Sequence, residues 1–228
     1  MRFSFLIFPF VGLIIAVIIY AFIYSFYKLG LSPVFFSAIA VAVSVIITGG
    51  LHFDGFCDTS DALSSNRDKE EKLRILKDPN VGAFAVIYTV IVLLLQFGAW
   101  VQIFSLPEHW LQALIAFIIS RILVSITVVS FPCARSSGLA SVFAGYASKK
   151  LVRNILLTYM IISFLGLVYL HPISGMFILA YVLVSFFWFY SMVKKQFGGI
   201  TGDLAGFYLV VCETGILSTL AAVGGLIK

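Results

Sequence analysis

The stretch from Pro33 to Leu63 reads PVFFSAIAVAVSVIITGGLHFDGFCDTSDAL. Its first part is an apolar run close to the roughly 20 residues that a helix needs to cross a bilayer. Its second part carries Asp54, Asp58 and Asp61, whose i, i+4 and i+7 spacing places three carboxylates on one face of a helix. Crowded carboxylates must be solvated, protonated or neutralised by a cation, and clustered oxygen ligands suit Mg²⁺. The stretch therefore predicts a metal-dependent polar site at the boundary of a membrane.

The composition favours a membrane protein over a soluble one. The chain is 61% hydrophobic and only 11% charged, whereas soluble domains carry roughly 25% charged residues. Seven apolar segments are long enough to cross a bilayer: 5–26, 33–51, 82–104, 111–131, 153–170, 173–193 and 203–226. We therefore expect an all-α, polytopic integral membrane bundle of about seven transmembrane helices in one domain, residues 1–228.

The basic residues are distributed unevenly between the two sides of this predicted bundle. Twelve of the fifteen Lys and Arg residues lie at the N-terminus or in the connections 52–81, 132–153 and 194–202. Lys28 and Lys228 fall on the other side, and Arg121 falls inside a predicted span. The positive-inside rule then predicts that the N-terminus and the three basic connections are cytoplasmic and form the active-site face.

The other distinctive polar motifs fall on the same predicted side. Glycines allow a backbone to approach a ligand closely, and helix N-termini favour anions. Carboxylates, basic residues and glycine turns together suit a pyrophosphate ester and Mg²⁺. The predicted catalytic and metal-binding residues are Asp54, Asp58, Asp61 and Asp203. The predicted substrate-binding residues on this side are His52, Arg67, Lys77, Arg135, Gly198, Gly199 and Thr201. Taken singly, each basic or glycine motif also fits a solvated face, a topology signal or a structural turn.

Two further charged residues lie within predicted spans. Arg121 and Glu213 are each ten residues from the predicted cytoplasmic end of their helix, a depth of roughly 15 Å. A single charge at that depth is costly, and matched depth with opposite sign predicts a buried ion pair. The pair is a candidate floor of the substrate cleft, and its alternative role is to join two helices.

In their order along the chain, these motifs resemble those of the cobalamin synthase family, also called adenosylcobinamide-GDP ribazoletransferase. The similarity extends over nearly the whole chain. It rests on residues 49–63, on Lys77-Asp78 followed by residues 81–84, on Arg135 with Gly138-Leu139, and on residues 198–203 with Glu213. Cys57 and Ser60 stand where small residues such as alanine are expected, but neither removes a carboxylate.

The resemblance implies the last joining step in assembly of the cobalamin nucleotide loop. Adenosylcobinamide-GDP would react with α-ribazole, or its 5′-phosphate, to give adenosylcobalamin, or its 5′-phosphate, and GMP. It also implies dependence on Mg²⁺, a multi-pass location in the bacterial cytoplasmic (inner) membrane and an active site that faces the cytoplasm. No nucleic-acid partner is expected, and the oligomeric state is left open.

Two other functional classes share part of this pattern. A CDP-alcohol phosphotransferase that makes phospholipids also uses clustered aspartates at a membrane surface. However, the residues after Asp61 lack the further glycine and aspartates of that enzyme's usual pattern. A transporter would also carry intramembrane charges, but it should show repeated groups of spans, and none is evident here.

Overall fold

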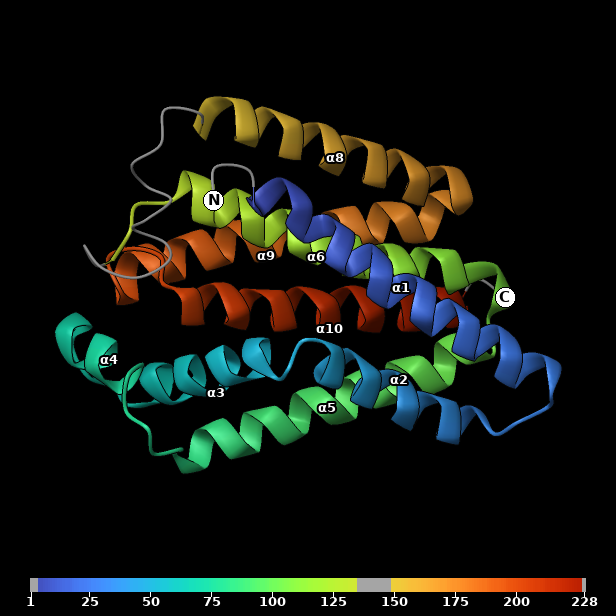
Figure 1. The fold of residues 1–228 in the computed structure, drawn as a ribbon, viewed down its shortest axis with the longest axis horizontal. Helices are drawn as coiled ribbons and strands as arrows, with labels where there is room; N and C mark the ends of the chain where they lie inside the picture. The colour runs from blue at the N-terminus through green and yellow to red at the C-terminus, as the bar shows by residue number, and fades with distance from the viewer. Residues whose placement is uncertain (1–3, 135–148, 227–228) are drawn as a thin grey trace.

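The computed structural model describes residues 4–134 and 149–226, which form a bundle of helices (Figure 1). The helices are α1 (Ser4–Lys28), α2 (Pro33–Ile47), α3 (Leu51–Ser64), α4 (Lys69–Ile75), α5 (Ala83–Phe104), α6 (Trp110–Ser130), α8 (Lys149–Leu170), α9 (Pro172–Gln196) and α10 (Gly202–Leu226), with a short 3-10 helix, η1 (Pro107–His109), before α6. The predicted all-α membrane bundle is confirmed.

Six of the helical segments in the described ranges are long and apolar enough to cross a membrane: α1, α5, η1 with α6, α8, α9 and α10. Large apolar side chains cover the outside of the bundle, among them Ile14, Leu94 and Phe187. A soluble protein does not expose so much continuous apolar surface, because water disfavours it. The chain is therefore a multi-pass membrane protein.

The predicted span over residues 33–51 is not one straight helix. The structure ends α2 at Ile47, and α3 leaves the break at 90° to α2. Gly49 and Gly50 have φ angles of 63° and 73°, and their N–H groups donate to Ile46 and Val45. Glycine adopts this left-handed backbone readily and so ends a helix there. The bent pair still carries the chain between the two ends of the bundle, and it is the seventh crossing if counted as one span (Figure 1).

Helices α6 and α10 form the centre of the bundle. Helices α1 and α8 pack on α6, while α3, α5 and α9 pack on α10. In Figure 1, the first part of α10 lies between α9 and α3. Gly12 brings α1 close to α6, because a Cβ atom at Gly12 would lie 2.3 Å from the carbonyl oxygen of Phe117. Small residues allow such close approach of helices in membranes, where packing drives their association.

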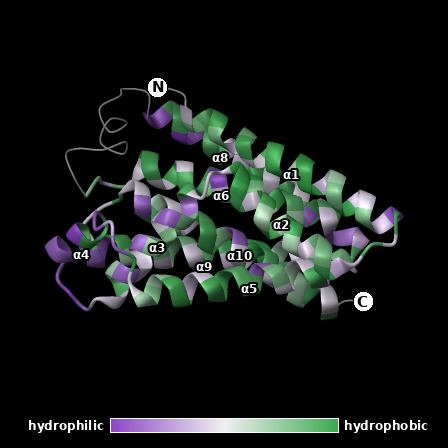
Figure 2. Ribbon diagram, turned by 60° about the horizontal axis from the view of Figure 1, so that its bottom comes forward, coloured by the Kyte–Doolittle hydropathy of each residue, from purple (hydrophilic) through white to green (hydrophobic). Residues whose placement is uncertain are grey.

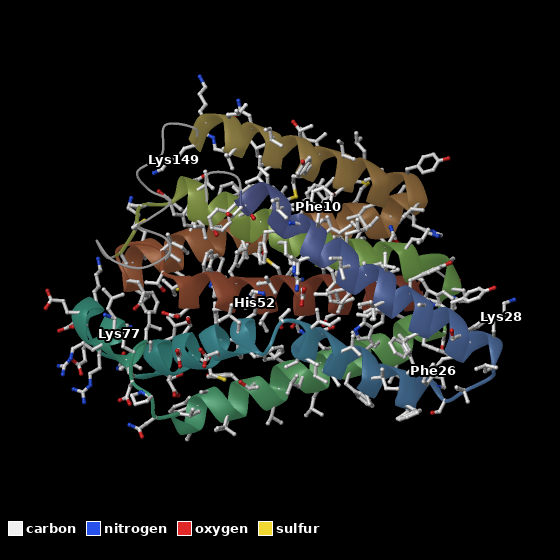
Figure 3. The ribbon with its side chains drawn as sticks, viewed as in Figure 1. Phe10, Phe26, Lys28, His52, Lys77 and Lys149 are labelled. Atoms are coloured by element: carbon white, nitrogen blue, oxygen red, sulfur yellow. The ribbon has the colours of Figure 1, made fainter. Side chains whose placement is uncertain are left out.

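The two ends of the bundle differ in polarity. The hydrophilic helix α4 marks one end (Figure 2), and Lys77 and Lys149 lie at that end while Lys28 lies at the other (Figure 3). The Lys72 ammonium is buried and donates to Gln196 Oε1 at the end of α9, which docks α4 on the bundle. The region 52–81, predicted as a connection between spans, thus contains most of α3 and all of α4.

Candidate functional site

Helix α3 carries the three predicted carboxylates and crosses α10 at two glycines. A Cβ atom at Gly55 would lie 2.7 Å from the backbone oxygen of Asp203, and one at Gly206 would lie 3.2 Å from the backbone oxygen of His52. The absence of both side chains lets the two backbones approach closely. The crossing therefore brings the first turn of α10, with Asp203, against the acidic helix.

Asp58 lies at the centre of the resulting group of four acids. The negative charges of Asp54, Asp203 and Asp61 all act on its carboxyl group. Asp58 is half-buried and Asp54 is exposed. Within the described residues, neither of the two ion pairs involves Asp54, Asp58 or Asp61. The site thus gathers four carboxylates at the end of the bundle that carries Lys77 and Lys149 (Figure 3).

The turn before α10 is held by backbone pairing. The N–H of Ile200 donates to Pro132 at 2.8 Å, and the N–H of Ala134 donates to Ile200 at 3.1 Å. A Cβ atom at Gly199 would lie 2.5 Å from the Ala134 nitrogen, and Gly198 has a φ of 77°. The positive φ angle at Gly198 and the close backbone approach at Gly199 thus both require glycine. The pairing joins the end of α6 to the start of α10.

Thr201 completes this turn. Its hydroxyl accepts the N–H of Leu204 at 3.2 Å and donates to Asp203 Oδ2 at 3.4 Å. A threonine oxygen in this position caps the first turn of a helix. Thr201 therefore fixes the start of α10 and the side chain of Asp203 together, and its contact with substrate stays a prediction.

Asp61 is engaged differently from its neighbours. Its Oδ2 accepts the N–H of Gly82, and its Oδ1 accepts the N–H of Ala85 at 2.9 Å. Gly82 directly precedes α5. The Asp61 carboxylate is therefore an anionic cap on the N-terminus of a neighbouring helix, where negative charge is stabilising.

The predicted ion pair between Arg121 and Glu213 is confirmed. Arg121 Nη1 contacts Glu213 Oε1 directly, and both residues are buried. The Ser120 hydroxyl accepts from Arg121 Nη1 at 3.0 Å and donates to Glu213 Oε1 at 3.3 Å. The charge of Arg121 also acts on His52 in the first turn of α3. The pair thus joins α6 to α10 on the membrane side of the acidic group.

The structure describes only two of the three basic residues that were predicted to contact the pyrophosphate. Arg67 and Lys77 are exposed in the connections between α3 and α5. In the described ranges, no ion pair joins either residue to the four acids. Arg135 lies outside the described residues. The structure therefore leaves the roles of these three residues as predictions.

The donor set fits a hard cation in its chemistry. Carboxylate oxygens are the ligands that Mg²⁺ prefers, and a divalent cation would relieve the repulsion around Asp58. In the part of the chain that the structure describes, no three His, Cys, Asp or Glu side chains already lie close enough to hold a metal. A cation would therefore have to draw the carboxylates of α3 and α10 closer together.

Sequence comparison agrees with this architecture. Residues 1–221 match the family model described as cobalamin-5-phosphate synthase. The chain belongs to the cobalamin-5-phosphate synthase family. It is 36% identical to a protein named adenosylcobinamide-GDP ribazoletransferase from Lachnoclostridium phytofermentans, over 98% of this chain and 84% of the relative. No solved structure matches the chain.

Relatives from other bacteria have the same printed name. One from Clostridium perfringens (strain SM101) is 40% identical over 92% of this chain and 84% of its own length. One from Pseudomonas syringae pv. syringae is 34% identical over 96% of this chain and 87% of its own length. Membership of the cobalamin-5-phosphate synthase family makes the chain a membrane transferase of cobalamin biosynthesis, as the motif order indicated.

Three glycines that sequence reasoning did not single out hold this family member's site together. Gly55 and Gly206 set the distance between α3 and α10, and Gly82 lets α5 approach Asp61. The sequence carried a weak signal for Gly55 and Gly82, because each lies inside a motif of the resemblance. Gly206 lies in an apolar helix with no such signal.

Replacing Gly55 with alanine should separate α3 from α10 and reduce turnover by about 10²-fold, because misplacement by about 1 Å can cost that much. The added Cβ meets backbone atoms of Asp203, which cannot rotate away as a side chain would. Gly98→Ala is the matched control, since no atom lies within 4 Å of its Cβ position. Steady-state turnover of both variants in detergent tests this. Equal activity of the two would show that the close crossing is unimportant.

Proposed function

We propose that this chain joins adenosylcobinamide-GDP to α-ribazole, or to its 5′-phosphate, in a Mg²⁺-dependent reaction on the cytoplasmic face of the inner membrane. The observation that carries the proposal is the group of four carboxylates that α3 and α10 form at the end of the bundle that carries α4, Lys77 and Lys149. Relatives over most of the chain are named for ribazole transfer to adenosylcobinamide-GDP, which supports these substrates.

The reaction exchanges a phosphoanhydride bond for a phosphate ester. A hydroxyl oxygen of α-ribazole attacks the phosphorus atom attached to cobinamide, and the bond from that phosphorus to the bridging oxygen breaks. GMP leaves with the bridging oxygen, and the hydroxyl loses its proton. The product is adenosylcobalamin, or its 5′-phosphate when the phosphorylated ribazole reacts. Such a transfer depends chiefly on positioning and on stabilisation of phosphate charge.

Different residues of this chain would bind the metal, position it and contact the substrate. Asp54, Asp58 and Asp203 would hold Mg²⁺, which when bound neutralises charge on the phosphate oxygens. The close crossing at Gly55 and the capped turn at Thr201 keep Asp203 beside α3. Lys77, Arg67 and Arg135 remain the predicted contacts to the pyrophosphate, since Arg suits bidentate phosphate recognition. His52, backed by the buried pair of Arg121 and Glu213, would border the substrate on the membrane side.

A product assay tests the function directly. Purified protein in detergent is supplied with adenosylcobinamide-GDP and α-ribazole, with and without Mg²⁺. We expect a cobalamin product and GMP in equal amounts, and only with the metal. Formation of phospholipid and CMP from a CDP-alcohol would favour the phosphotransferase alternative. Uptake into vesicles without any covalent product would favour a transporter.

The proposed cytoplasmic position of the site predicts the labelling of introduced cysteines. Cys57 and Cys133 would first be changed to serine, leaving the buried Cys212. A Lys69→Cys variant on α4 should react with an impermeant thiol reagent only after the cytoplasmic face is opened. Lys28→Cys, at the other end of the bundle (Figure 3), should react from outside in intact cells. The opposite pattern would reverse the topology.

A further inference from the structure

The carboxylate of Asp61 is covered by the first turn of α5. Its Oδ1 and Oδ2 accept the N–H groups of Ala85 and Gly82. A Cβ atom at Gly82 would lie between 2.5 and 2.6 Å from all three carboxylate atoms. Only the absence of that atom lets the backbone lie directly against the acid. The contact therefore has two halves, an anion on α3 and a glycine before α5.

Asp61 also lies at a different level of α3 from the other acids. The start of α10 meets α3 at Gly55, where a Cβ atom would lie 2.7 to 3.2 Å from the Asp203 backbone. Asp61 is six residues farther along the helix, a rise of about 9 Å. Mg²⁺ binds its ligands at about 2.1 Å. A cation held beside the start of α10 therefore lies closer to the levels of Asp54 and Asp58 on α3 than to that of Asp61.

The cap of α5 also determines where the preceding loop lies. Lys77, Asp78 and Asn80 lie two to five residues before Gly82 along the chain. Asp78 Oδ1 accepts the Asn80 backbone N–H at 2.9 Å and its side-chain amide at 2.7 Å. This turn gives the loop a defined shape, and Asp61 joins its far end to α3. The position of Lys77 relative to Asp58 thus depends on the contact between Asp61 and Gly82.

We propose that Asp61 is a positioning residue rather than a metal ligand. Its carboxylate clamps α5 and the loop of Lys77 to the acidic helix through Gly82, while the cation site is formed by Asp54, Asp58 and Asp203. The inference deepens the proposed function and rests on it for the identity of the metal and the substrate. The clamp itself rests only on the contacts around Asp61.

The test compares two single variants that act on the same contact from opposite sides. Asp61→Asn leaves one oxygen for two N–H donors, and Gly82→Ala inserts a methyl group against the carboxylate. Each should reduce turnover by about 10²-fold, as expected for a site misplaced by about 1 Å. The double variant should lose little more than either single one, because both break one interaction. Gly98→Ala, with open space around its Cβ position, is the control in the same helix.

Binding of Mn²⁺ as a paramagnetic substitute for Mg²⁺ separates the clamp from a ligand role. The dissociation constant of Mn²⁺ should stay within about threefold of wild type in Asp61→Asn and Gly82→Ala, but rise at least about tenfold in Asp58→Asn, where a ligand is lost. A tenfold rise in Asp61→Asn but not in Gly82→Ala would overturn the proposal. A loss of activity in the double variant equal to the product of the two single-variant losses would also overturn it.

Two further measurements test the contact between Asp61 and Gly82 even if the wild-type protein binds no Mn²⁺ or forms no product. The Tm in detergent should fall in both single variants and fall no further in the double one, whereas additive losses would contradict a shared contact. A thiol introduced by Asn80→Cys should be labelled faster when Asp61 is also changed to Asn. An unchanged labelling rate would overturn the clamp even if Gly82→Ala does not fold. Absence of Mn²⁺ binding or product in wild type would instead count against the proposed function.

Discussion

Replacing Asp58 with asparagine is expected to reduce ribazole transfer by about 10²- to 10³-fold, the range seen when one electrostatic contact to a transition state is lost. The substitution keeps the shape of the side chain but removes its negative charge. The negative charges of Asp54, Asp203 and Asp61 all act on the carboxyl group of Asp58. Its loss should therefore weaken the proposed cation site more than any other single change.

The folded state of the Asp58→Asn variant should be preserved or slightly stabilised, because removing one charge relieves repulsion among the other three acids. Turnover would be measured over a range of Mg²⁺ concentrations, with Tm measured in the same detergent. Glu108→Gln is a suitable control, since Glu108 is an exposed acid in η1, remote from α3. Near-normal turnover of Asp58→Asn with unchanged metal dependence would show that Asp58 does not hold the cation.

Removing either member of the pair formed by Arg121 and Glu213 should destabilise the protein by about 3–5 kcal/mol, because the remaining charge is then buried without a partner. Arg121 is 1% exposed and Glu213 is 5% exposed. Ser120 bonds to both residues but carries no charge to replace either of them. Arg121→Ala and Glu213→Ala should therefore each lower the free energy of unfolding.

The double variant should be less destabilised than the sum of the two single ones, since it leaves no unpaired charge. Unfolding in mixed detergent micelles would supply the four free energies of this cycle. Arg121→Ala combined with Lys72→Ala provides the comparison, because Lys72 bonds to Gln196 on α9 and their losses should add. Strictly additive losses for Arg121 and Glu213 would show that their contact contributes no coupling energy.

Local patterns were enough to predict the helical architecture and the positions of most spans. A long apolar run requires a helix in a bilayer, because lipid cannot satisfy free backbone groups. The i, i+4 and i+7 spacing placed the three acids on one helix, and α3 confirms that helix. Counting residues from the predicted cytoplasmic end of each span placed Arg121 and Glu213 at the same depth and predicted that they pair. The structure confirms the contact. The order of the motifs indicated the family.

Hydropathy alone did not predict the break in the helix after Ile47. Residues 33–51 read as one apolar segment, yet α2 and α3 meet at 90°. Hydropathy measures the preference of side chains for lipid and carries no term for the backbone angle. Gly49 and Gly50 can adopt either hand of backbone, and the packing of α3 on α10 and α5 selects the left-handed one.

The sequence by itself determined that the chain is a helical membrane protein of this family with an acidic helix and a buried ion pair, because composition, periodicity and motif order are properties of the chain alone. Only the tertiary structure decided that Gly55 and Gly206 bring Asp203 to α3, and that Asp61 caps α5 while Asp58 lies among the other acids. Identical residue types on one helical face thus acquire different environments. The physical reason is that hydrogen bonds and close backbone contacts between helices depend on which residues meet in space.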